Sequence, residues 1–252
     1  MEDYLQNNNT FEANDRTKTG INKLDNLIQG GFPKGSFVVA SGTAGSGKTI
    51  FGCQFISEGI KNNEKCLFIS AEQTSEEIVE QAKQFGWDFN NWEKEGRLRI
   101  MSLLGKQLFE TKAIDEIKVL MRDTKYDRVV FDSITSILNA PFSKYNIADG
   151  ADRGLPPQAL NEISRANITE FIDFIKQNGI TTLGVAQKIE GLPGETIDKV
   201  SEFKADGLVV FNSTAVGQNL NRTIQVKKLR KTKIDGVPHR FDFTENGILL
   251  TE

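Results

Sequence analysis

The sequence predicts an α/β fold: a mainly parallel, twisted sheet flanked by helices, with antiparallel strands in its last third. Two observations predict this fold. As far as residue 186, short apolar runs alternate with helix-period segments, which is typical of parallel strands joined by crossover helices. After residue 206, strand-like runs follow one another with Gly, Asn and Asp between them, which favours antiparallel or mixed pairing. We therefore expect one extended sheet.

Apolar runs place the strands. The parallel strands are expected at 36–41, 65–70, 98–101, 128–132 and 180–186. The last third adds expected strands at 207–211, 222–229, 239–243 and 248–250.

Helical periodicity places four helices between the parallel strands. They are expected at 48–61, 74–85, 113–124 and 156–177. Thr74 followed by Glu77 predicts a capping box at the start of the second helix. Asn178 and Gly179 end the last of these helices.

Composition limits the class of protein. Residues 1–16 are polar and rich in Asn, so we expect a flexible N-terminal arm before a single domain at 17–252. The chain has no apolar run of about 18 residues and no signal-peptide pattern, so we expect a cytoplasmic protein without a membrane span. Cys53 and Cys66 are then expected to be reduced, packed thiols.

Charge and residue counts exclude two kinds of site. Thirty-one basic residues against 34 acidic ones give a net charge of −3, which excludes a globally basic surface for nucleic acid and leaves a local basic patch as an alternative. His239 is the only histidine, which excludes a multi-histidine metal site.

A glycine-rich motif lies between the first of the parallel strands and its helix. Residues 42–49 are GTAGSGKT, the full GxxxxGK[ST] pattern of phosphate-binding loops (P-loops). Backbone N–H groups of such a loop surround phosphates, and Gly tolerates the dihedral angles that this requires. Lys48 is expected to reach the β- and γ-phosphates, and the Thr49 hydroxyl to bind Mg²⁺. The expected nucleotide-binding residues here are Gly42, Thr43, Ala44, Gly45, Ser46, Gly47, Lys48, Thr49 and Ile50.

Two strand ends add carboxylates to this site. Asp132 closes the apolar strand 128–132 and is expected to hold Mg²⁺, the arrangement called Walker B. Glu72 follows the strand 65–70 and is expected to orient and deprotonate a water molecule, with a further candidate role as a metal ligand. The alternatives are a turn cap for Asp132 and a solvated residue for Glu72.

Further segments carry a family resemblance. They are TGI at 19–21, GGFPKG at 30–35, FGWD at 85–88, DSITS at 132–136 and KLR at 228–230. Together they resemble the KaiC-like ATPases of the RecA superfamily, over about residues 17–250. The resemblance implies a RecA-like P-loop core, ATP and Mg²⁺ as cofactors, and slow ATP hydrolysis.

The resemblance also implies a homo-oligomeric ring, usually a hexamer, with ATP between subunits. Lys228 and Arg230 would then contact the γ-phosphate on a neighbouring subunit, as an arginine finger does. Leu229 and Thr232 are expected nucleotide contacts, and Glu245 falls where the family touches ribose or base. The alternative for 227–233 is a solvated edge strand whose lysines discourage aggregation. The expected catalytic residues are Lys48, Glu72, Lys228 and Arg230.

The chain departs from the family pattern at some positions. The family commonly has two glutamates after the second strand, whereas this chain has Glu72 and then Gln73, which cannot accept a proton. Lys231 stands where the family has Gly. Gln187 closes its strand where RecA itself has a glutamine that senses the γ-phosphate. The region of Ser201 resembles the non-phosphorylated first domain of the clock protein, so autokinase activity is not expected.

Three functions remain as alternatives. We favour a regulatory ATPase ring that switches an unidentified protein client. A RecA- or RadA-like DNA-repair protein would need cations in the long loops 139–155 and 188–204, which are neutral or acidic, although Phe142 and Tyr145 are candidates for base stacking. A nucleotide-switched scaffold with little hydrolysis is the third, and Gln73 motivates it.

Overall fold

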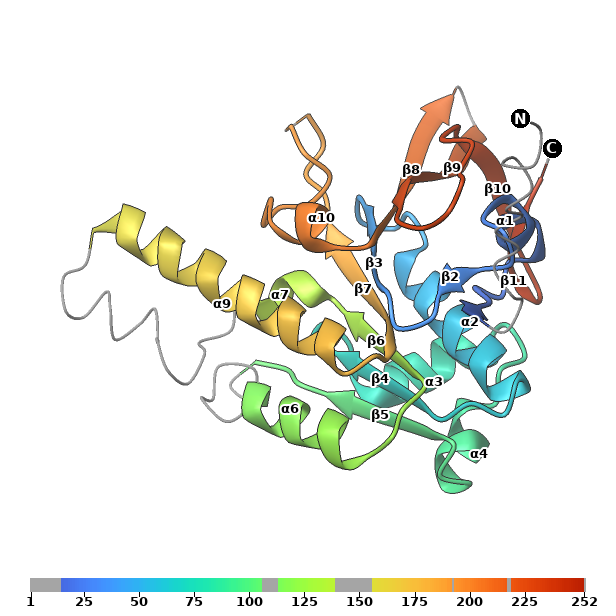
Figure 1. Ribbon diagram of the computed structural model, residues 1–252. Coiled ribbons are helices and arrows are strands. Elements are labelled where there is room, and N and C mark those ends of the chain that lie inside the picture. The colour runs from blue at the N-terminus through green and yellow to red at the C-terminus, as the bar shows by residue number, and fades with distance from the viewer. Residues whose placement is uncertain (1–14, 106–112, 139–155, 192, 217–218, 252) are drawn as a thin grey trace, which may run out of the picture.

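β3 (Phe37–Gly42) lies in the interior of a nine-stranded sheet, in a computed structural model that describes residues 15–105, 113–138, 156–191, 193–216 and 219–251. The strand order is β11-β10-β9-β8-β3-β7-β6-β4-β5 (Figure 1). Parallel pairing joins β3 to β7 (Thr181–Gln187), and continues through β6 (Arg128–Asp132), β4 (Cys66–Ser70) and β5 (Leu98–Ser102). The predicted mainly parallel sheet is confirmed.

The last third of the chain extends this sheet on the other side of β3. β8 (Gly207–Val216) pairs in parallel with β3 and in antiparallel with β9 (Asn219–Leu229). β10 (His239–Thr244) and β11 (Gly247–Leu250) follow, each antiparallel to its neighbours. The predicted mixed extension of the same sheet is therefore confirmed.

β8 and β9 are longer than predicted, because the predicted runs cover only 207–211 and 222–229. Beyond Phe211, the ladder with β9 continues through Asn212, Ser213 and Thr214. These side chains are polar and at least partly exposed, so no apolar run indicates a strand there. Backbone pairing within the hairpin, and not burial, extends the ladder.

Four helices match the predicted segments: α2 (Lys48–Lys61), α3 (Ser75–Lys83), α6 (Ala113–Asp123) and α9 (Pro157–Gln177). The predicted capping box at α3 is confirmed, since the Glu77 N–H donates to Thr74 Oγ1 at 3.2 Å and the Thr74 N–H donates to Glu77 Oε2 at 2.8 Å. The prediction lacks α1 (Asn22–Leu27), α4 (Phe89–Lys94), α7 (Ile134–Leu138) and α10 (Ser201–Lys204). These helices have four to six residues, too few to show a helical period.

The two faces of the sheet carry two hydrophobic cores, because side chains alternate along each strand. Val38 and Ala40 of β3 face the core that includes residues of α1, α2, α3 and α4. Phe37 and Val39 face the core that includes residues of α6, α7 and α9. Helices therefore cover both faces of the parallel strands (Figure 1). None of the helices in the described ranges is long and apolar enough to cross a membrane.

A short ladder flanks α1 and differs from the prediction, with one strand before the helix and one after it. β1 (Arg16–Thr17) pairs in antiparallel with β2 (Phe32–Pro33), and both β1 residues are buried. Gly31 allows this approach, since its φ is +124° and a Cβ there would lie 2.3 Å from the Thr17 carbonyl oxygen. Arg16 thus belongs to the folded part of the chain and not to the predicted arm. Residues 1–14 of that arm lie outside the described residues.

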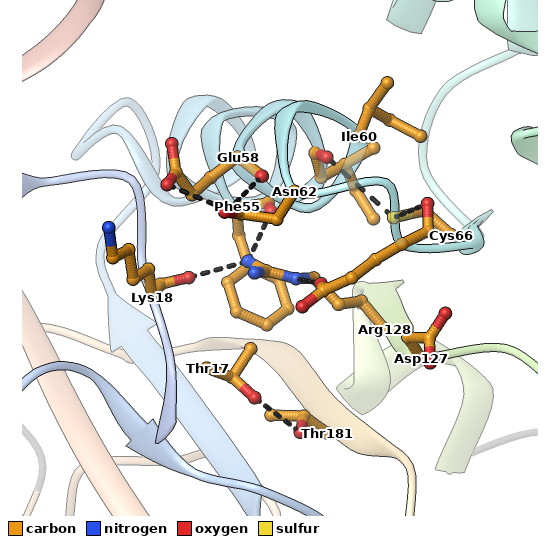
Figure 2. Close-up of polar contacts among 12 residues, drawn as sticks. Thr17, Lys18, Phe55, Glu58, Ile60, Asn62, Cys66, Asp127, Arg128 and Thr181 are labelled. Atoms are coloured by element: carbon orange, nitrogen blue, oxygen red, sulfur yellow. Dashed lines mark hydrogen bonds and ion pairs between the residues drawn. The ribbon is translucent and has the colours of Figure 1, made fainter. Parts of the chain in front are cut away.

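Arg128, the first residue of β6, is a buried cation that joins three parts of the chain (Figure 2). Its Nη1 donates to the carbonyl oxygens of Lys18 at 2.6 Å and Phe55 at 2.9 Å. Its Nε donates to the Glu64 carboxylate, and its guanidinium lies 4.6 Å from the centroid of the Phe55 ring. A Cβ at position 59 would meet Arg128 Cδ at 2.7 Å, so α2 needs glycine there. The segment before α1, helix α2 and strand β6 are held together by this one side chain.

We expect Arg128→Ala to lower the free energy of unfolding by about 3–5 kcal/mol, because it leaves the buried carbonyls and Glu64 unpaired and opens a cavity. Urea denaturation followed by circular dichroism measures the change. Arg99→Ala is the control, since Arg99 is exposed on β5 and its loss should change stability by no more than about 0.5 kcal/mol. Equal effects of the two variants would show that Arg128 is not a structural anchor.

Candidate nucleotide-binding site

The glycine-rich loop leaves β3 at Gly42 and enters α2 at Lys48. Gly47 has a φ of +102°, and a Cβ there would lie 2.8 Å from Cζ of Phe243. A Cβ at Gly42 would lie 2.5 Å from the carbonyl oxygen of Phe211. The loop therefore needs glycine at both positions because neighbouring strands press against it, in addition to the dihedral requirement at Gly47.

Lys48 lies buried beneath the loop. Its ammonium group donates to the Thr43 carbonyl oxygen at 2.7 Å and to Ser46 Oγ at 3.4 Å. Burial lowers the pKa of Lys48, and the nearby carboxylates of Asp132 and Glu72 act in the opposite direction. The loop thus holds a cation where the phosphates of a nucleotide would lie.

Asp132 lies at the same edge of the sheet. It pairs with Ser70 on one side and Val185 on the other, so the ends of β4 and β6 lie level with Val185, two residues before the end of β7. The carboxyl group is buried, and its Oδ1 has no hydrogen-bond partner among the residues that the structure describes. Burial raises the pKa of Asp132 to about 6, although a hydrogen bond with the Thr49 side chain lowers it.

These oxygens fit a magnesium ion. Within the described ranges no group of three or more His, Cys, Asp or Glu side chains could hold a metal. Mg²⁺ bound with a nucleotide needs only one or two protein carboxylates, because phosphates and water fill the remaining positions. The unpartnered Asp132 Oδ1 and the adjacent Thr49 hydroxyl supply the donors that this binding mode requires.

Glu72 lies at the wall of the same cavity, after β4. Its Oε1 accepts a hydrogen bond from Gln187 Nε2 at 2.8 Å, so the ends of β4 and β7 are linked through their side chains. The charge of Glu72 acts on both Asp132 and Lys48. This places a carboxylate beside the phosphate loop, as the sequence predicts.

The cavity around these groups has a volume of about 460 Å³. Its lining includes the predicted residues Ala44, Gly45, Gly47, Lys48, Thr49, Ile50, Glu72 and Asp132. It also includes Gln81 and Phe243, which no motif in the sequence indicates as site residues. Phe243 alternates with Phe241 along a predicted strand, but this alternation does not tell which loop the ring meets.

Lys228 and Arg230 lie at the edge of the sheet where the parallel strands begin, and the phosphate loop lies at the edge where they end. Leu229 pairs with Gly207, which pairs with Val38 near the start of β3. The loop begins at Gly42, four residues or about 13 Å further along the strand. Within one chain, these side chains therefore do not meet the cavity that they are predicted to serve.

Both cations are engaged by their own chain at that edge. Lys228 Nζ donates to the carbonyl oxygens of Glu202 at 3.3 Å and Phe203 at 2.9 Å. Arg230 Nη1 lies 3.4 Å from Asp206 Oδ1, which also accepts from Lys176 Nζ at 2.8 Å. Burial lowers the pKa of Lys228, and the charge of Arg230 lowers it further.

The remaining family-derived residues are also away from the cavity lining. Leu229 is buried, and Thr232 Oγ1 accepts from Arg16 Nη1 at 2.6 Å. Glu245 is exposed between β10 and β11. Ser201 is buried, and its hydroxyl donates to Asp198 Oδ2 at 2.8 Å.

The fold and the site together define a P-loop protein with a RecA-like core. The chain belongs to the KaiC ATPase family, whose model matches residues 17–146 and 157–252. Membership confirms the resemblance drawn from the sequence, and a KaiC-family ATPase domain implies nucleotide binding.

Relatives of two lengths resemble the chain. The circadian clock oscillator protein KaiC of Synechococcus elongatus is 29% identical over 251 residues, and the match covers 96% of this chain but 45% of that protein. The chain thus spans about half the length of these clock relatives. A UPF0273 protein of Thermotoga maritima is 28% identical, with 93% of this chain and 95% of that protein covered. The crystal structure of a KaiC-like protein from Pyrococcus horikoshii OT3 superposes with a TM-score of 0.78 at 26% identity, over 94% of this chain and 99% of that chain.

We expect Asp132→Asn to raise the free energy of unfolding at pH 7 by about 2–3 kcal/mol without Mg²⁺ or nucleotide. The pKa of Asp132 rises from 3.8 in the unfolded reference to about 6 when folded, so the folded state holds the proton more tightly. Stability of the wild type is therefore lost as the pH rises from about 4 to 6, and the asparagine variant avoids this loss. Urea denaturation in EDTA at pH 4, 5.5 and 7 measures the difference.

The matched control is Asp242→Asn, because Asp242 is exposed on β10. Its effect on stability should stay within about 0.5 kcal/mol at every pH. A gain for Asp132→Asn that is as large at pH 4 as at pH 7 would contradict the assigned titration.

Proposed function

We propose that the chain is an ATP-binding, Mg²⁺-dependent ATPase of slow turnover that works as a homo-oligomeric ring with its active sites between subunits. The observation that supports the proposal is the division of the machinery between two edges of one sheet. Lys48, Thr49, Asp132 and Glu72 surround one cavity, whereas Lys228 and Arg230 lie at the other edge. Only a second subunit would bring both halves together.

The cavity residues support hydrolysis of a phosphoanhydride bond. Lys48 would bind the β- and γ-phosphates, and Mg²⁺, when bound by Thr49 and Asp132, would neutralise the charge of the phosphate oxygens. Water attacks the γ-phosphorus, the bond to the ADP oxygen breaks, and Glu72 takes the proton of the water. Gln187 Nε2 donates to Oε1 of Glu72, which leaves the other carboxylate oxygen of Glu72 for the water.

Lys228 and Arg230 would stabilise the same reaction on the neighbouring subunit. Asp206 and the Phe203 carbonyl keep both cations at one edge in the single chain. Arg230 is exposed, so a nucleotide on a neighbour can replace its long contact with Asp206. Charge that develops on the γ-phosphate makes such a cation worth a large factor in rate.

Two variants mixed together test the shared site. Lys48→Ala and Arg230→Ala should each lower ATP turnover by about a thousandfold when assayed alone. An equal mixture, dissociated and reassembled, should recover up to about a quarter of the wild-type rate. In a heterologous ring each phosphate loop meets Arg230 of one neighbour, and about one site in four then has both Lys48 and Arg230. Phosphate release measures turnover, and light scattering after size-exclusion chromatography with and without Mg-ATP measures assembly.

Arg240→Ala is the control for the mixture, since Arg240 is exposed on β10. It should retain wild-type turnover. A mixture of the two inactive variants that stays inactive, although pull-down of an affinity-tagged copy of one variant retains the other, would contradict a site completed in trans.

A nucleotide-switched scaffold is the second candidate, and Gln73 beside Glu72 favours it. Glu72→Gln distinguishes the two functions, because it removes the proposed base and keeps the side-chain size. For an ATPase we expect a loss of turnover of about 100-fold or more with ATP affinity retained. Equal turnover of the wild type and Glu72→Gln would support the scaffold instead.

DNA repair is less favoured by the contacts of the loop that follows β7. Lys188 and Lys227 both pair with Glu195, so both cations near this loop are already engaged by a carboxylate of the same chain. Phosphate binding needs free cations. The other candidate DNA loop, 139–155, lies outside the described residues. A protein client that responds to the nucleotide state of the ring, in the cytoplasm, remains part of the proposal.

A further inference from the structure

A cluster of charged side chains lies at the edge of the sheet where the parallel strands begin. Its carboxylate is Asp206, which precedes β8, and its cations are Lys176 of α9, Lys228 of β9 and Arg230. Burial lowers the pKa of Lys228, and the charges of Arg230 and Lys176 lower it further, against the opposite effect of Asp206. The cations therefore repel one another, and the proposed function gives Lys176 no role.

Asp206 is an acceptor that the backbone holds in place. Its N–H donates to the Phe37 carbonyl oxygen at 2.8 Å, and its own carbonyl oxygen accepts from the Arg230 N–H at 2.8 Å. Its Oδ2 accepts from the Phe37 N–H at 3.1 Å. The other carboxylate oxygen, Oδ1, is the one that the side chains of Lys176 and Arg230 contact. Two cations thus share one oxygen atom.

Lys176 and Arg230 share this oxygen unequally. Lys176 Nζ lies 2.8 Å from Asp206 Oδ1, whereas Arg230 Nη1 lies 3.4 Å away. Charge-assisted hydrogen bonds between nitrogen and oxygen are usually about 2.7–2.9 Å long, so only the Lys176 contact has that length. The Lys176 side chain is 29% exposed and that of Arg230 is 55% exposed. Lys176 is the close partner of Asp206, and Arg230 is the loosely held one.

This unequal sharing lowers the cost of moving Arg230. To contact an anion outside its own chain, Arg230 has to leave Asp206, and a partly buried carboxylate that loses its cation is unfavourable. Lys176 stays paired with the same oxygen, so the carboxylate keeps a partner. The positive charge of Lys176 also repels the guanidinium. Without Lys176, Asp206 would have Arg230 as its remaining cation and would hold it more strongly.

We propose that Lys176 is a positioning residue, which occupies Asp206 and so keeps Arg230 available for the nucleotide of a neighbouring subunit. The inference rests on the proposed shared site and adds how its trans-acting cation is released. Lys176 acts through Arg230, so its effect belongs to the subunit that supplies Arg230. A purely structural role, in which Lys176 only ties α9 to the start of β8, would have the same effect in either subunit.

Mixed rings test the inference, because they assign each half of the site to a different chain. Arg230→Ala supplies the phosphate loop, and Lys48→Ala supplies Arg230. Lys176→Met, which keeps an unbranched stem and removes the charge, is added to one chain or the other. On the Lys48→Ala chain it should lower phosphate release by about threefold to fivefold, as expected for one partly exposed ion pair. On the Arg230→Ala chain, which has no Arg230 to release, it should have no such effect.

Two further variants of the Lys48→Ala chain test whether charge is the cause. Lys176→Arg retains the charge and should keep the rate of the mixture. Asp206→Asn, added to Lys176→Met, should recover the lost rate, because no carboxylate is left to hold Arg230. The asparagine oxygen can still accept from the Phe37 N–H, so the backbone contact is kept. The KM for ATP should be the same in all of these mixtures, since the phosphate loop belongs to the other chain.

Lys118→Met on the Lys48→Ala chain is the matched control. Lys118 pairs with Glu170 of α9 at 3.2 Å, so this variant also breaks an ion pair of that helix, and the rate should stay unchanged. Thermal unfolding of each chain and pull-down of a tagged copy check that folding and mixed assembly are retained.

The outcomes separate the inference from the proposed function. If Lys48→Ala and Arg230→Ala copurify but their mixture is inactive, the shared site is overturned, and the inference with it. If the mixture is active and Lys176→Met has no effect on the Lys48→Ala chain, or an equal effect on both chains, the inference is overturned and the shared site stands. A loss confined to the chain that supplies Arg230, and recovered by Asp206→Asn, supports the inference.

Discussion

The candidate site depends on β3 being hydrogen-bonded in parallel on both of its sides. Gly42 pairs with Gln187 of β7 and with Phe211 of β8, so the phosphate loop starts level with both. The next pairing places Asp132 beside Val185. A slip of one residue in any of these ladders would turn the side chains of that strand to the other face. The register of the parallel strands therefore positions the phosphate loop, Asp132 and Gln187 together.

Arg128 provides the corresponding constraint at the other edge of the sheet (Figure 2). A buried guanidinium is stable only when acceptors pair with its N–H groups and an opposite charge balances its own. Glu64 supplies the negative charge, and the carbonyl oxygens of Lys18 and Phe55 supply further acceptors. Gly59 leaves room for it in α2. Helix α2 begins at Lys48 of the phosphate loop. By holding α2 in place, Arg128 therefore also fixes the end of the loop.

Local patterns in the sequence predict most of the fold, and the loop motif predicts the centre of the site. Apolar runs and the capping box at Thr74 depend on neighbours in sequence, so the parallel strands and α3 could be predicted. Phe243 and Gln81 depend on which strand and helix face the loop, a long-range property that neither periodicity nor spacing encodes. For the same reason, the KLR segment identifies Lys228 and Arg230 as candidates but does not predict their position. The pairing of β8 with β9 places them at the end of the sheet far from Gly42.

The contact between Gly47 and Phe243 has a consequence for the order in which the chain can acquire its structure. Phe243 follows Gly47 by nearly two hundred residues, and Gln54 of the same helix bonds the backbone of Ile248 through both its amide nitrogen and its oxygen. On the ribosome, residues are added from the N-terminus, so β3 and α2 emerge long before the strands that support the loop. During synthesis the phosphate loop therefore lacks the strands that later pack against it. It reaches its final shape only after β10 and β11 have formed.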